Sequence, residues 1–215
     1  MLHSLTGFDH LLIRVPDLAE ASAVFARLGF AVEQDRIRLG AMHLRLEAAE
    51  GKARFGHLAF ASTDVQASEK AFIALPGLSH QVVPLSPPLL GAHDNKGQAI
   101  ASLTAVLENP EAAMPAYDAV FGNFAATPTD DMVTVHGGGP LLFLTDEDGF
   151  DHLHSNLAVR LSGQPGLEAI AITVSNLDAA EAVLKSNTVR FSRLGESIAI
   201  HPDHCLGLGI ELVSA

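Results

Sequence analysis

One pattern recurs four times along the chain and limits the folds open to it. Each copy begins with a short apolar strand, continues through a polar turn and ends in an alanine-rich amphipathic helix. The copies are DHLLIRVPDLAEASAVFARLG from Asp9, GHLAFASTDVQASEKAFIALPG from Gly56, ASLTAVLENPEAAMPAYDAVFG from Ala101 and EAIAITVSNLDAAEAVLKSN from Glu168. A repeat of this kind sets the architecture of the whole chain.

The four copies share one register. A residue at the start of each strand is followed, seven positions later, by Asp or Asn; the pairs are His10 and Asp17, His57 and Asp64, Ser102 and Asn109, Ala169 and Asn176. The short side chains of Asp and Asn accept hydrogen bonds from the free N–H groups of a helix's first turn. The shared register therefore predicts four capped helices in four equivalent units.

The segments after the helices indicate further strands. Residues 131–144 form a hairpin pattern around three glycines, and short alternating runs follow the first and fourth helices. The unit is thus a strand, a helix and two or three more strands. The second unit departs from this pattern, because Pro84, Pro87 and Pro88 disfavour a central strand. We expect that unit to have lost or loosened its last strands.

Composition excludes several functional classes. The net charge is −12, and no Lys/Arg cluster appears, so neither nucleic acid nor an anionic membrane is an expected partner. Cys205 is the only cysteine, which rules out a disulfide framework, and nothing around it marks an activated nucleophile. The N-terminal MLHSLTG has no signal-peptide pattern, so we expect a cytoplasmic protein.

The segments FDHLLIRVPDLAEASAVFARLGF and FGHLAFASTDVQASEKAF resemble the vicinal oxygen chelate superfamily, in particular its glyoxalase-like, bleomycin-resistance-like and extradiol-dioxygenase members. The resemblance implies an α+β fold in which paired βαβββ units form curved mixed sheets around a cleft. It places residues 1–98 in an N-terminal pair of units and residues 99–215 in a C-terminal pair. It also implies a divalent metal that binds two adjacent oxygens of a substrate.

Ligands in that family come from the start of the first strand and the end of the last strand of paired units. Carried onto this sequence, the resemblance implies His10, Glu47 and His57 as metal ligands, for Zn, Ni, Mn or Fe. In the C-terminal pair, Ser102 and Ala169 stand where histidine would be, and only Glu211 is retained. The C-terminal half is therefore expected to be a pseudo-site that holds no metal.

Strand alternation adds candidate substrate-binding residues. His10 and Arg14 fall on one side of their strand, and His43, Arg45 and Glu47 share one side of theirs. Arg14, Arg45 and His43 are the candidates for holding a substrate carboxylate. The competing interpretation is ordinary: partly buried histidines with backbone partners, a solvated Glu47, and arginines that pair with the acidic excess.

Two main hypotheses follow. The first is a metal-dependent lyase, isomerase or dioxygenase acting on a small oxygenated metabolite in the cleft. The second is a non-enzymatic protein of the same fold that binds or sequesters a small molecule without metal. A scaffold without a ligand is a third. Four units in one chain can form paired clefts without a partner, so the sequence is compatible with a monomer or a homodimer.

Overall fold

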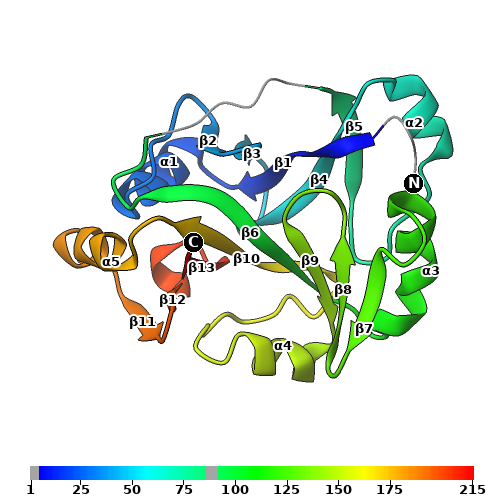
Figure 1. Ribbon diagram of the computed structural model, residues 1–215. Coiled ribbons are helices and arrows are strands. Elements are labelled where there is room, and N and C mark those ends of the chain that lie inside the picture. Colours follow the sequence, from blue (N-terminus) through cyan, green and yellow to red (C-terminus); the bar gives the residue numbers. More distant parts are fainter. Residues whose placement is uncertain (1–4, 86–91) are drawn as a thin grey trace.

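The computed structural model of the protein describes residues 5–85 and 92–215, and the N-terminal half forms one sheet with two helices (Figure 1). The first unit keeps two strands after its helix, and the second keeps one in the described residues. Their elements are β1 (Leu5–Val15), α1 (Leu18–Arg27), β2 (Arg36–Leu39), β3 (Met42–Ala48), β4 (Arg54–Ser62), α2 (Val65–Ala71) and β5 (His80–Pro84). The expected loosening of the second unit is seen at Pro84, where β5 ends; Pro87 and Pro88 lie outside the described residues.

The C-terminal half contains two full units separated by an additional helix, α4 (Glu147–Leu153). The third unit is β6 (Gly97–Val106), α3 (Pro110–Phe121), β7 (Ala126–Thr129), β8 (Met132–His136) and β9 (Leu141–Thr145). The fourth is β10 (Gly166–Val174), α5 (Leu177–Ser186), β11 (Phe191–Leu194), β12 (Ser197–Ile200), a 3-10 turn (Pro202–His204) and β13 (Gly209–Ser214). Each of these two units has the full strand–helix–three-strand order.

The four predicted helix caps are all present. Asp17 accepts hydrogen bonds from two backbone N–H groups of α1, and Asp64, Asn109 and Asn176 each accept one from the third residue that follows them. Each cap residue has an extended backbone, as an N-cap requires. The repeat that the sequence indicates is therefore a repeat of local structure.

Each half of the chain forms its own mixed sheet. The first has strand order β2-β3-β1-β4-β5, and the second has order β11-β12-β13-β10-β6-β9-β8-β7. In the first sheet β1 runs parallel to β3 and antiparallel to β4; in the second, β10 runs parallel to β13 and antiparallel to β6. The same arrangement around β1 and β10 allows the two sheets to be compared position by position.

Alternation along the strands separates a core side from an outer side. Leu11 and Ile13 of β1 lie in one hydrophobic cluster with Phe25 of α1 and with Ile170 and Ile172 of β10. Both sheets therefore contribute to a single core. Figure 1 shows α1 beside α5 at one end of the molecule and α2 beside α3 at the other.

The junction between α1 and α5 depends on a glycine. Gly29, which follows the C-cap of α1, has a φ of +89°, and a Cβ there would lie 2.7 Å from Cγ1 of Val183 in α5. Asn187 donates a hydrogen bond to the carbonyl of Arg27 across the same junction, at 2.8 Å. The position thus needs both a left-handed backbone and the smallest side chain.

Candidate metal and ligand site

The outer side of the first sheet is polar. In β3, Leu44 and Leu46 belong to the hydrophobic core, whereas His43, Arg45 and Glu47 between and beyond them do not. The same alternation in β1 places His10, Leu12 and Arg14 on the outer side, and in β2 it places Arg36 and Arg38 there. We call these eight residues, together with His57 of β4, the outer face of the first sheet.

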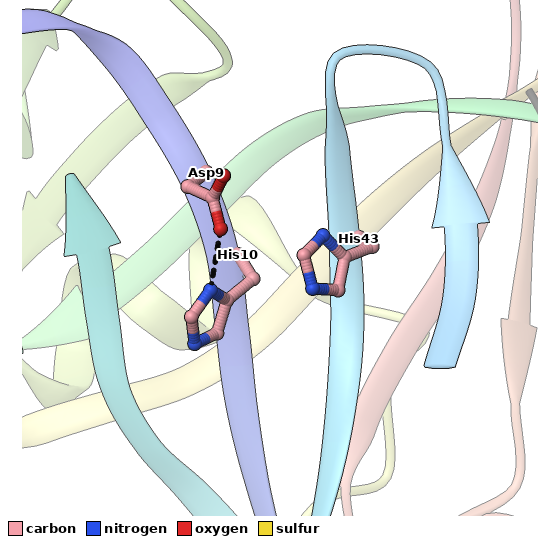
Figure 2. Close-up of side chains that lie close together, drawn as sticks. All are labelled: Asp9, His10 and His43. Atoms are coloured by element: carbon pink, nitrogen blue, oxygen red, sulfur yellow. Dashed lines mark hydrogen bonds and ion pairs between the residues drawn. The ribbon is translucent and has the colours of Figure 1, made fainter. Parts of the chain in front are cut away.

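Three histidines meet on this face. His10 and His43 are register partners across the parallel β1–β3 pair, and their ring centroids are 5.0 Å apart. The centroid of His57, on the antiparallel neighbour β4, is 5.8 Å from that of His10. Figure 2 shows the rings of His10 and His43 side by side on their strands. His10 therefore lies between two other imidazoles.

Asp9 fixes the orientation of His10. Its Oδ1 accepts a hydrogen bond from Nδ1 of His10 at 2.7 Å, and both side chains are buried (Figure 2). A neutral imidazole that donates through Nδ1 keeps its lone pair on Nε2. Nε2 of His10 and Nε2 of His57 are both buried and make no hydrogen bond within the described part of the chain. Buried polar atoms of native proteins normally have partners, so these two call for a ligand.

The other two rings are held in the neutral state. Burial, followed by the charge of His10, lowers the pKa of His43 to about 4. Burial, again followed by His10, lowers the pKa of His57 below its ordinary value. A neutral imidazole is the form that coordinates a metal ion. Asp9, His10 and His43 also offer three ligand atoms that lie within 4.8 Å of one another.

Glu47, expected as the third ligand, lies further along the strand. It is the register partner of Arg14, four positions beyond the His10–His43 pair, which corresponds to about 13 Å of strand. Its Oε1 is 3.9 Å from Nε of Arg14, and both side chains are more than two-fifths exposed. Its negative charge acts on His57, whose pKa it raises against the larger effect of burial. The structure thus brings His10 and His57 together and leaves Glu47 at the rim.

The candidate substrate-binding residues divide in the same way. His43 is in the histidine cluster, and Arg14 and Arg45 flank it on the same face. Nε of Arg45 lies 3.5 Å from Oδ2 of Asp35 and is buried without a hydrogen bond to any described residue. Arg14 reaches Glu47 only at a distance typical of a weak ion pair.

The corresponding face of the second sheet is filled by the chain itself. His154, directly after α4, donates from Nδ1 to Oε2 of Glu211 at 2.9 Å, and its Nε2 accepts from the hydroxyl of Thr104 at 2.9 Å. All three residues are buried. Phe150 and Leu157 pack on either side of this network against Val106 of β6, Ala169 of β10 and Ala199 of β12. The helix α4 and its continuation therefore cover this face.

Register identifies the equivalent positions of the two sheets. His10 pairs with His43 as Ala169 pairs with Gly209, so the counterpart of Glu211 in the first sheet is Arg45. The counterpart of Glu47 is Val213. A guanidinium thus stands in the first sheet where the second sheet has a carboxylate.

Sequence reasoning missed two elements of this picture. Strict alternation puts Asp9 on the opposite side from His10, but a register irregularity between Phe8 and His10 lets the two side chains meet. The role of His154 was also missed, because it lies outside the fourfold repeat. The only signal there was its place in a histidine-containing segment without a strand pattern.

A large cavity lies elsewhere in the described structure. It has a volume of about 1280 Å³ and is lined by Arg54, Phe55, Glu168 and Asp203 among others, but not by the three histidines. Its buried carboxyl group, Glu168, already accepts hydrogen bonds from the backbone N–H and hydroxyl of Ser162. Asp203 is likewise paired with Arg190 at 2.6 Å. We therefore locate the candidate site at the histidines, where polar atoms lack partners.

No helix in the described ranges combines the length and apolarity needed to cross a membrane. No protein-family model and no curated protein sequence matches the chain.

Solved structures do match it. A mutant 4-hydroxymandelate synthase from Streptomyces coelicolor is 17% identical with a TM-score of 0.67, over 98% of this chain and 92% of that one. An Mn(II)-bound glyoxalase from Novosphingobium aromaticivorans is 15% identical with a TM-score of 0.62, over 98% and 82%. A homoprotocatechuate 2,3-dioxygenase variant from B. fuscum is 12% identical with a TM-score of 0.63, over 99% and 72%. At these identities the likeness concerns the fold, and it confirms at that level the resemblance that the sequence indicated.

Proposed function

Since this chain has the vicinal oxygen chelate fold, we propose that it is a divalent-metal-dependent enzyme whose ion is held by His10, His43 and His57. The observation that carries the proposal is the cluster itself. Three imidazoles lie next to one another on three neighbouring strands, with His10 in the middle, and two of them have a buried nitrogen without a hydrogen-bond partner among the described residues. His43 here takes the place that the sequence suggested for Glu47.

The spacing of neighbouring rings is compatible with one shared ion, and His57 lies outside the group of three ligand atoms within 4.8 Å of one another, which is Asp9, His10 and His43. A metal–nitrogen bond of about 2.1 Å puts the centroid of a bound imidazole about 3.2 Å from the metal, so two bound rings have centroids about 5 Å apart. The distances from His10 to His43 and His57 are 5.0 and 5.8 Å. Three imidazoles suit Zn, Ni or Fe, and with added oxygen ligands they also suit Mn.

The protein's own residues complete the arrangement. Asp9 holds His10 in the tautomer that leaves Nε2 free, as carboxylates do for metal-bound histidines. An ion bound here would polarise a substrate oxygen or activate a bound water. Lyase, isomerase and dioxygenase chemistry all use that effect. Among the proteins of the same fold, one is a glyoxalase bound to Mn(II) and another is a dioxygenase.

A second candidate function is a metal-free binding protein of the same fold. The observation that favours it is the replacement of carboxylates: Arg45 occupies the register position of Glu211, and the second unit keeps a single strand after its helix in the described residues. Such a protein would sequester a small molecule on the outer face of the first sheet.

Titration with Co²⁺ distinguishes the candidates without requiring a known substrate. Coordination of Co²⁺ by imidazole produces visible absorption bands. We expect these bands when Co²⁺ is added to the wild-type protein, and we expect their loss in His10→Ala, His43→Ala and His57→Ala. Glu47→Gln is the matched control, because it removes a charge from the same face but no proposed ligand. Bands lost in Glu47→Gln but kept in His43→Ala would replace our ligand set with His10, Glu47 and His57. No bands in the wild-type protein would favour the binding protein.

A further inference from the structure

We propose that the ligand of the histidine site is a small carboxylate, anchored by the arginines of the outer face of the first sheet. This inference rests on the proposed function, because it takes the three histidines to be the metal site. It goes further in arguing the carboxylate, which the sequence only suggested, from the structure of the face, and in assigning its selection to Arg45.

Four arginines surround the histidines. In the register of the sheet, Arg38 of β2 is beside His43 and Arg36 is beside Arg45, while Arg14 of β1 lies two residue pairs beyond the row of Arg45. The whole chain has only 13 lysines and arginines and a net charge of −12, yet four of these cations share one sheet face. Such a gathering of arginines on an acidic protein is a feature of surfaces that bind anions.

The arginines are close enough to affect the rings. The charges of Arg36 and Arg38 both act to lower the pKa of His43. Those of Arg14 and Arg45 act in the same direction on the pKa of His57. Asp9 acts in the opposite direction on the pKa of His43, and Glu47 does so on the pKa of His57, so the histidine cluster lies among charges of both signs.

Nearby carboxylates balance this charge in number, but in the described residues only Arg38 has a hydrogen bond to its carboxylate. Asp35 is shared, with Oδ1 at 3.6 Å from Arg36 and Oδ2 at 3.5 Å from Arg45. Glu33 pairs with Arg38 at 3.0 Å, and Glu47 is 3.9 Å from Arg14. Asp9, the remaining acid of the cluster, is engaged by His10. Nε of Arg45 is buried with no hydrogen-bond acceptor in the described residues, so that guanidinium has bonding capacity to spare.

The ligand set adds to the need for an anion. Three neutral imidazoles bring no negative charge, so a bound divalent ion would keep both of its positive charges. The second sheet has the carboxylate of Glu211 where the first has Arg45. A guanidinium beside a metal ion is repelled by it unless an anion lies between them. A carboxylate can interact with the metal ion and the guanidinium together, because it can bind the ion with one oxygen and accept paired hydrogen bonds from arginine.

Calorimetric titration of the purified holo-protein with oxalate tests the inference. We expect oxalate to bind at least about tenfold more tightly than its neutral analogue oxamide, and Arg45→Met to weaken oxalate binding by about tenfold or more. Arg14→Met is a second variant, expected to weaken binding less because Arg14 lies further from His43. The matched control is Arg193→Met, which removes an ion-paired arginine of similar exposure from β11 of the other sheet.

The outcomes separate this inference from the proposed function. Equal binding of oxalate and oxamide, or unchanged oxalate binding in Arg45→Met with its metal retained, would overturn the carboxylate assignment and leave the metal site standing. Binding of inorganic phosphate without binding of oxalate would overturn it too. A wild-type protein that takes up no metal but binds oxalate through Arg45 would refute the proposed function and support the arginine anchor.

Discussion

The two sheets have equivalent faces that differ in what lies on them: α4 covers the second, whereas the first carries a cluster of histidines. Three residues paired across β2, β3 and β1 of the first sheet are Arg36, Arg45 and Leu12. The equivalent residues across β12, β13 and β10 of the second sheet are Ala199, Glu211 and Ala171. The second face is covered by α4, whose Phe150 packs on it. The first keeps buried histidine nitrogens without partners in the described chain. The two faces thus have the same strand arrangement, and their side chains determine which of them is covered by another segment of the chain.

The largest effect is expected where α4 covers the second sheet. Phe150 is 1% exposed and lies at the centre of the small cluster between α4 and the sheet. Phe150→Ala should lower the free energy of unfolding by about 3–5 kcal/mol through lost burial and a cavity. Chemical denaturation measures this. A loss below about 1 kcal/mol would mean that α4 rests on the face without being part of its core.

His154→Ala should come next. It leaves the buried carboxylate of Glu211 and the hydroxyl of Thr104 without their partner, at a cost of about 3 kcal/mol. Imidazole added in solution should bind in the vacated space and raise the melting temperature of the variant but not of the wild type. The control is His152→Ala, since His152 is exposed on the same helix. An equal response of both variants to imidazole would contradict an internal ligand at this face.

These two regions also show what the sequence can predict. The cap register gave the four helices and, through them, the alignment of β1 with β10, because capping is a local interaction. The prediction of Glu47 as a ligand rested on its place in the last strand, whereas the β1–β3 pairing shows that the counterpart of Glu211 is Arg45. Asp9 depended on an irregularity in strand pairing, and His154 on a tertiary contact made by a segment outside the repeat. Neither leaves a periodic pattern.

The contact between the two halves gives a smaller effect. Gly29→Ala forces a left-handed residue to carry a Cβ and pushes it against Val183. We expect a loss of about 1–3 kcal/mol in unfolding free energy, with the helices otherwise intact by circular dichroism. Gly163→Ala is the matched control, because Gly163 also has positive φ but no atom within 4 Å of its would-be Cβ. Equal losses would show that backbone strain alone matters at Gly29.

The smallest effect concerns the buried thiol of the second half. Burial, with a smaller contribution from Asp203, raises the pKa of Cys205 to about 12. At pH 8 the native thiol should therefore stay protonated and react with a disulfide reagent far more slowly than in the denatured chain. Because the folded pKa lies above the unfolded value of 9.0, the thiol's contribution to stability should be complete below pH 9 and decline towards pH 12. Rapid native labelling at pH 8 would contradict this burial.

The contrast between a first face whose histidine nitrogens lack partners in the described residues and a filled second face is tested most directly by elemental metal analysis of the purified protein. The account predicts about one divalent ion per chain in the wild type and in His154→Ala, and less than about a tenth of that in His10→Ala. The metal content of the wild type would show that the protein binds an ion. Its retention in His154→Ala and loss in His10→Ala would show that the ion binds on the first sheet. A wild-type protein that contains no metal and takes up none when Zn, Ni, Mn or Fe is added, or a His10→Ala variant that keeps its ion, would contradict the account.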